Sequence, residues 1–191
     1  MIPRSWMVAS VKIKSPPVGQ WLPRIHAAEL LIVRHCASPR RVACALAVVG
    51  SKLGNGWAYP PLLCVLIWVG GASAWEAILV AALSVVALHC IYPFVKIWSA
   101  RARPFDADPR LRSLLPPLDL HSFPSGHVMT LTAVAVPIAV AFPASIVPLF
   151  CLWLFVSWSR VACAHHYPSD ILAGTLMALS VAGPLALWRF S

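Results

Sequence analysis

Four long apolar runs occupy most of the chain from residue 57 onward, and Glu76 or a polar segment separates each run from the next. Residues 57–75, 77–95 and 171–188 carry no Asp, Glu, Lys or Arg, and Glu76 separates the first two runs. A helix needs about 20 apolar residues to cross a bilayer, so each of these runs is predicted to form a span. The fourth run, residues 128–158, is too long for one span and too short for two complete ones. Pro143 divides it near its centre, which predicts a hairpin of two helices that borrow residues beyond each end.

The first 56 residues follow a different pattern. Two moderately apolar pieces, residues 26–35 and 42–50, are interrupted by Arg34, Pro39, Arg40 and Arg41. They are predicted to be basic amphipathic helices that lie on the membrane surface, with a tilted first span as the alternative. The predicted fold is therefore all-α: a polytopic transmembrane bundle of five or six spans (residues 57–191), preceded by a basic amphipathic region (residues 1–56), within a single domain.

Composition supports this interpretation. Hydrophobic residues make up 60% of the 191 residues and charged residues only 11%, whereas soluble domains average about 25% charged. The alternative, that the runs are buried helices of a soluble protein, is disfavoured by four such runs in one short chain. The formal net charge is +9. Anionic lipid head groups or a phosphorylated substrate explain this excess better than nucleic acid does, because so apolar a chain does not stay in solution.

Most of the remaining polar residues lie in two connecting segments, residues 96–127 and 159–170. Since the intervening hairpin crosses the bilayer twice, both segments are predicted to emerge on the same side. Guanidinium, ammonium, imidazole and carboxylate groups therefore meet at one membrane face. Buried cations that lie close together lose hydration and repel one another, so the cluster calls for an anion.

Two local patterns within these segments carry chemistry, although each is weak alone. Ser125 and Gly126 directly precede an apolar helix, where a serine N-cap and free backbone amides form an anion site. His127 lies beside them as a potential proton donor. Asp170, four residues after His166, is placed to accept a hydrogen bond from the imidazole and orient it as a nucleophile.

In combination the patterns are much more specific. Lys96 is followed after six residues by Arg103-Pro104. The segment 124–127 reads Pro-Ser-Gly-His. Arg160 is followed after five residues by His166 and, after three more, by Asp170. This arrangement resembles the three-part signature of the type 2 phosphatidic acid phosphatase superfamily, which also includes vanadium haloperoxidases.

The resemblance implies hydrolysis of a phosphomonoester or pyrophosphate of a lipid without a metal or other cofactor. His166 would attack phosphorus and form a phosphohistidine, Asp170 would fix its tautomer, and His127 would protonate the leaving oxygen. Five residues would hold the phosphoryl group: Lys96, Arg103, Ser125, Gly126 and Arg160. His165 is adjacent to the nucleophile, but the spacing selects His166.

The lipid and the membrane face stay open at this point. The resemblance implies an isoprenoid diphosphate, phosphatidic acid or phosphatidylglycerol phosphate, with a slight preference for the isoprenoid carrier, in a bacterial inner (plasma) membrane. Three other functions compete with this one. The first is a transporter or binding protein for an anionic lipid, and the second is a vanadate-dependent peroxidase. The third is a metal-dependent hydrolase that would use a cluster of polar side chains: His121, His127, His165, His166 and Asp170.

Overall fold

The computed structural model describes residues 23–37 and 40–191, which form helices joined by loops. Predictions about residues 1–22 lie outside the described residues. The helices follow in this order: α1 (Pro23–Cys36), α2 (Arg41–Lys52), the π-helical turn η3 (Leu53–Trp57), α3 (Tyr59–Ser99), α4 (Pro104–Ala107), α5 (Gly126–Ala141), the 3-10 turn η4 (Pro143–Ser145), α6 (Ile146–Ala162) and α7 (Pro168–Phe190). The all-α prediction is confirmed for this part of the chain.

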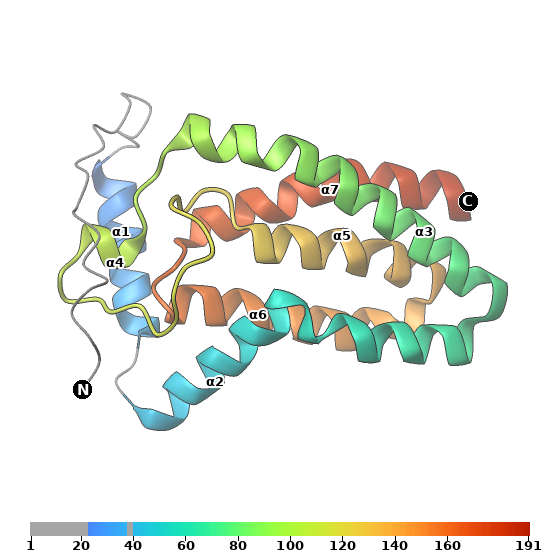
Figure 1. Cartoon of the computed structure of the whole chain (residues 1–191), viewed down its shortest axis with the longest axis horizontal. Coiled ribbons are helices and arrows are strands. Elements are labelled where there is room, and N and C mark those ends of the chain that lie inside the picture. Colours follow the sequence, from blue (N-terminus) through green and yellow to red (C-terminus); the bar gives the residue numbers. More distant parts are fainter. Residues whose placement is uncertain (1–22, 38–39) are drawn as a thin grey trace.

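Helix α3 consists of two arms that fold back on each other (Figure 1). The reversal occurs at Gly71, whose φ of 53° and ψ of −135° are open to glycine and strained for other residues. The two predicted runs are therefore real, but the chain turns at Gly71, earlier than the predicted break at Glu76. Glu76 instead lies on the second arm and forms an ion pair with Arg189 of α7, which compensates its charge.

The predicted hairpin at Pro143 is confirmed. Helices α5 and α6 run in opposite directions, and η4 begins at Pro143 between them (Figure 1). By length and composition, three described stretches are long and apolar enough to span a bilayer: Tyr59–Ala107, Pro143–Ala162 and Pro168–Phe190. Helix α5 is apolar but shorter. The number of five or six spans thus stays a prediction. The three long apolar stretches agree with the prediction that the chain is a membrane protein.

The predicted N-terminal helices are present as α1 and α2. Helix α1 lies across one end of the bundle, and α2 leads through a bend at η3 into the first arm of α3 (Figure 1). Because α2 also packs against α6, residues 41–57 are joined to the bundle. The prediction that these helices lie on the membrane surface stays a prediction.

Helix α7 packs tightly against α5 through a line of small residues. Gly174, Ala178, Ala182 and Ala186 are buried at four-residue spacing, and Asp170 begins the same line. A Cβ on Gly174 would lie 2.5 Å from the carbonyl oxygen of Ser125, so only glycine permits this approach. Small residues let helix backbones approach closely in membranes. This contact brings the start of α7 against the start of α5.

Candidate active site

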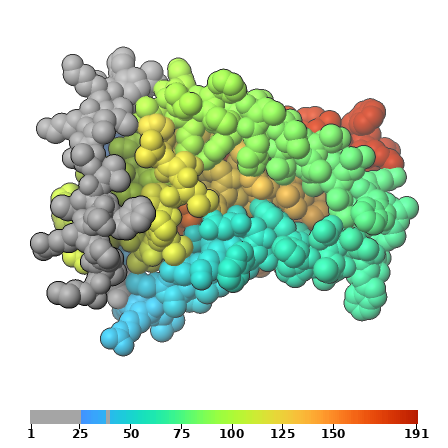
Figure 2. Space-filling model, viewed as in Figure 1, coloured from blue at the N-terminus to red at the C-terminus, as the bar shows by residue number. Residues whose placement is uncertain are grey.

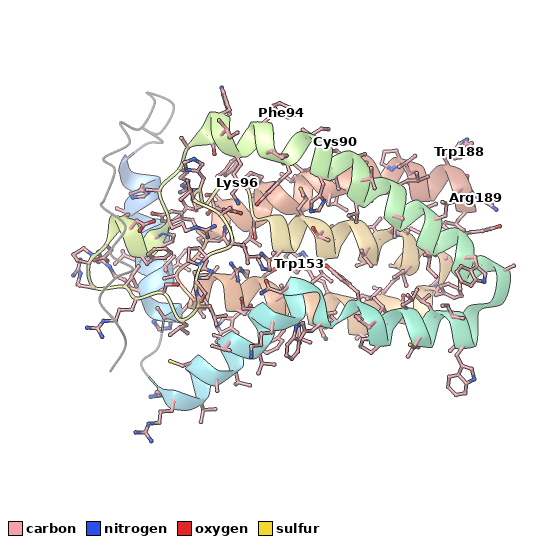
Figure 3. All side chains as sticks on the ribbon, in the orientation of Figure 1. Cys90, Phe94, Lys96, Trp153, Trp188 and Arg189 are labelled. Carbon is pink, nitrogen blue, oxygen red and sulfur yellow. The ribbon has the colours of Figure 1, made fainter. Side chains whose placement is uncertain are left out.

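The residues that the sequence singled out come from five parts of the chain and lie at one end of the bundle. Lys96 is in the last turn of α3, and Figure 3 shows it beside the loop before α5. Cys90 and Phe94 lie on the same helix, whereas Trp188 and Arg189 lie at the other end of the bundle. Arg103 precedes α4, and Arg160 is in the last turn of α6. Ser125, Gly126 and His127 begin α5, and His166 and Asp170 flank the start of α7.

Asp119 bridges two of the predicted phosphate-binding cations. Its carboxylate oxygens lie 2.8 Å from Lys96 Nζ and 2.6 Å from Arg103 Nη2. The hydroxyl of Tyr92 donates to the same carboxylate at 3.0 Å. Burial opposes ionisation of Asp119, but Lys96 and Arg103 outweigh it and lower its pKa below the ordinary value. Asp119 therefore supplies the negative charge that two buried cations need.

The third cation, Arg160, is 2% exposed and only partly satisfied. One of its terminal nitrogens donates to the Ser51 hydroxyl, and the other donates to Nδ1 of His165 at 2.6 Å. Its Nε is buried and has no hydrogen-bond partner among the described residues. A buried guanidinium donor without a partner is costly, so this group favours an incoming acceptor.

His166 is oriented by a backbone carbonyl that the sequence did not reveal. Its Nδ1–H donates to the carbonyl oxygen of Ser122 at 2.7 Å, whereas the carboxylate of Asp170 lies 3.6 Å away. The latter distance is too long for a hydrogen bond, so this structure does not contain the direct bond between His166 and Asp170, and the role of Asp170 in fixing the tautomer stays a prediction. The intervening loop brings the Ser122 carbonyl closer to the ring than the carboxylate. Asp170 remains the nearest negative charge, and no described residue bonds to Nε2.

The surroundings of His166 keep its imidazole neutral. Burial and the positive charges of Arg160, Arg103 and Lys96 lower the pKa of His166 well below its ordinary value. A histidine with a lowered pKa loses its proton as the pH rises through that low value, so it is neutral at pH 7. The unprotonated Nε2 is thus available as a nucleophile.

His165 is engaged through both ring nitrogens. Nδ1 accepts from Arg160, while Nε2 lies 2.9 Å from the Leu115 carbonyl oxygen and 2.6 Å from the Ser113 hydroxyl. Burial, followed by the charges of Arg160 and Arg103, lowers its pKa to about 3. The structure therefore leaves His165 without a free nitrogen, which agrees with the choice of His166.

The start of α5 presents donors to the same space. Ser125 is the N-cap of α5, and its hydroxyl is buried without a partner among the described residues. A Cβ on Gly126 would come within 2.7 Å of the Tyr92 hydroxyl. The amides of a helix's first turn have no partner within the helix, so they form an anion site there.

His127 faces the turn η3. Its Nε2 is hydrogen-bonded to the side-chain oxygen of Asn55, and Gly54 packs against the imidazole. A cavity of about 290 Å³ is lined by Asn55, His127, Tyr92 and Asp119, among others. The proposed proton donor therefore lines an opening beside the cations.

An apolar cavity of about 470 Å³ lies next to this opening, and Tyr59 lines both. Its other walls are apolar residues of the two arms of α3 and of α5, such as Leu66, Val85 and Ile138. Figure 2 shows α5 in orange at the floor of the space between the two arms. A polar opening with a neighbouring apolar groove suits an amphiphile.

Several residues at this site were missed by sequence reasoning. Asp119 and Arg101 lie in the segment that was expected to carry polar groups, but nothing local marked their partners. Arg101 forms ion pairs with both Asp170 and Glu29. Glu29 offered one signal in the sequence, since it is the sole acidic residue before Glu76. Asn55 stands between two glycines, a pattern typical of a turn. The Ser122 carbonyl had no signal, because a backbone acceptor leaves no trace in residue type.

Comparisons with known proteins match this arrangement. The model of the PAP2 superfamily matches residues 74–191. The undecaprenyl-diphosphatase BcrC of Bacillus subtilis (strain 168) is 30% identical over 133 residues, which is 68% of this chain and 66% of that protein. The aligned part thus spans slightly under two thirds of that relative.

Two crystal structures share the fold. The first transmembrane PAP2 type phosphatidylglycerolphosphate phosphatase from Bacillus subtilis superposes with a TM-score of 0.66 at 18% identity, covering 87% of this chain and 86% of that one. Aquifex aeolicus LpxE superposes with a TM-score of 0.64 at 22% identity, covering 83% and 94%. At these identities the likeness concerns the fold.

Proposed function

Because this chain belongs to the PAP2 superfamily, we propose that it is an integral membrane phosphatase. It removes a phosphoryl group from a lipid phosphate through a phosphohistidine, without a metal. The observation that carries the proposal is the pair of buried donors without partners, the Ser125 hydroxyl and Arg160 Nε. They belong to the same site as Lys96 and Arg103, whose charges are balanced by Asp119. A phosphate that displaces Asp119 satisfies all four groups at once.

The proposed reaction uses the imidazoles of His166 and His127 and the backbone carbonyl of Ser122. The Nε2 lone pair of His166 attacks phosphorus, while its Nδ1–H stays bonded to the Ser122 carbonyl. The bond from phosphorus to the lipid oxygen breaks, and His127 gives its proton to that oxygen. Water then attacks the phosphohistidine, returns a proton to His127, and releases inorganic phosphate and neutral His166. Cations and amides around the equatorial oxygens stabilise the charge of both transition states.

The two cavities support a lipid as substrate. The phosphate enters at the polar opening, and the apolar chain lies along the groove between the arms of α3. Of the three lipid classes, we favour an isoprenoid diphosphate, as the name of the BcrC relative describes. Phosphatidic acid and phosphatidylglycerol phosphate are the alternatives.

We place the protein in a bacterial plasma membrane, as its relatives from Bacillus subtilis support. The described basic residues of α1 and of the start of α2 lie at the same end of the bundle as the site (Figure 1). We propose that they share one side of the bilayer with it.

The test is phosphate release from the three lipids in detergent with excess EDTA. Wild type releases phosphate, and His166→Ala loses at least about 10³-fold in kcat, because the nucleophile is gone. His121→Ala, a substitution in the loop before α5, serves as the matched control and keeps wild-type activity. A requirement for added divalent metal, or full activity of His166→Ala, would refute the proposal. Lipid binding without turnover would favour the transporter or binding protein.

A further inference from the structure

A chain of buried charges connects α1 to the carboxylate behind the nucleophile. Nη1 of Arg101 lies 2.7 Å from Asp170 Oδ1, and its Nη2 lies 2.6 Å from Glu29 Oε2. The other oxygen of Glu29 accepts the backbone N–H of Ser169 at 2.8 Å. The second oxygen of Asp170 accepts the N–H of Tyr167 at 2.8 Å. Both carboxylates are therefore fixed at two points.

This chain is shielded from solvent. Side-chain exposure is 9% for Glu29, 11% for Arg101 and 0% for Asp170. The guanidinium of Arg101 also lies 3.9 Å from the centroid of the Tyr167 ring. In such surroundings charges interact strongly, and removal of one partner leaves another uncompensated.

We propose that Arg101 and Glu29 are positioning residues for the reaction: Arg101 holds Asp170 and balances its charge, and Glu29 in α1 holds Arg101. This inference rests on the proposed function. Neither residue is one of the positions that define the three-part signature. Helix α1 thereby becomes part of the catalytic apparatus, since it supplies the outermost charge of the chain.

The signs of the charges predict opposite effects of the two residues on His166. Charged and titratable groups around the imidazole come from every neighbouring element: Lys96 of α3, Arg103 before α4, Asp119 in the loop, His127 of α5, Arg160 of α6, His165 in the turn and Asp170 of α7. Without Arg101, the carboxyl groups of Asp170 and Glu29 lose their shared counter-ion, and any negative charge that they keep favours protonation of His166, which disables the nucleophile at acidic pH. Without Glu29, Arg101 balances Asp170 fully, and the neutral imidazole is retained.

The test compares kcat/KM for phosphate release at pH 5 and pH 7.5 on one lipid in EDTA. Division of a variant's ratio by the wild-type ratio cancels the titration of the substrate. In Arg101→Gln the ratio of the pH 5 to the pH 7.5 value falls below wild type, because loss of the nearby positive charge raises the pKa of His166. In Glu29→Gln the ratio does not fall. In the double variant it recovers toward wild type, because one of the two negative charges has also been removed.

Arg34→Gln is the matched control. Arg34 anchors the same helix through its ion pair with Asp108, 2.5 Å away, and makes no described contact with Asp170. Its ratio stays at the wild-type value. Arg101→Lys keeps the charge and also keeps the wild-type ratio. A ratio below the wild-type value in Arg101→Lys overturns the inference, so the test stands even if Arg101→Gln fails to fold.

A fall in Glu29→Gln as large as that in Arg101→Gln, or a double variant worse than Arg101→Gln, overturns the inference, because a merely structural contact gives additive loss. Absence of any phosphate release from folded wild type instead overturns the proposed function, and so the two failures are distinguishable.

Discussion

Asp119→Asn is expected to tighten the binding of inorganic phosphate. In the described structure Asp119 neutralises Lys96 and Arg103 through contacts of 2.8 and 2.6 Å. A phosphate that enters the site must displace this carboxylate, which competes for the same cations. The asparagine keeps the size of the side chain but removes its charge, and so the competition is relieved.

The expected gain in phosphate affinity follows from the solvent exposure of the Asp119 side chain. The side chain of Asp119 is 36% exposed, so each ion pair is close to the surface class, worth about 0.5–1 kcal/mol. Two such pairs give about 1–2 kcal/mol, which corresponds to about a 5- to 30-fold lower inhibition constant for phosphate. This figure is smaller than the Coulomb energy of a fully buried pair, because solvent screens the carboxylate.

The assay is competitive inhibition of lipid hydrolysis by inorganic phosphate in detergent at constant ionic strength. Asp106→Asn is the matched control: it removes the same charge near Arg103 from an exposed position in α4 that forms no ion pair among the described residues. Weaker inhibition by phosphate in Asp119→Asn than in wild type would refute the reasoning. That result would mean that Asp119 holds the cations in place for the substrate rather than competing with it.

Two further predictions concern the start of α5. His127→Ala is expected to lose about 10²- to 10⁴-fold in kcat on a lipid phosphate, the usual contribution of a general acid. The loss is far smaller on p-nitrophenyl phosphate, because its leaving group needs no proton. Equal losses on both substrates would contradict the acid role. Gly174→Ala is expected to destabilise the protein by about 1–3 kcal/mol, because the new Cβ would lie 2.5 Å from the Ser125 carbonyl oxygen. Thermal unfolding in detergent measures this, with Gly183→Ala as the control, since nothing lies within 4 Å of a Cβ there; an equal Tm in the two variants would contradict the close packing.

The sequence predicted the helical pattern well where local signals were strong. Helix α5 ends at Ala141 because Phe142, the residue before Pro143, is disfavoured in the helical conformation, and the α5–α6 hairpin follows from that. The turn of α3 was misplaced, because Glu76 looked like a break in hydropathy. Its charge is instead compensated by Arg189, a residue more than 100 positions away in the chain. Gly71 takes the reversal through a left-handed conformation that apolar patterning does not reveal.

For the candidate site, too, some features follow from the local sequence and others only from the tertiary structure. The sequence by itself determined which side chains are proposed to carry the chemistry, from Lys96 to Asp170, because their types and spacings are local properties of the chain. Only the tertiary structure decided that Asp119 balances the cations, that the Ser122 carbonyl orients His166, and that Glu29 reaches Arg101. These contacts depend on how loops and helices distant in sequence pack against each other. A backbone carbonyl or a lone carboxylate gives no sign of its partner until the fold brings the two together.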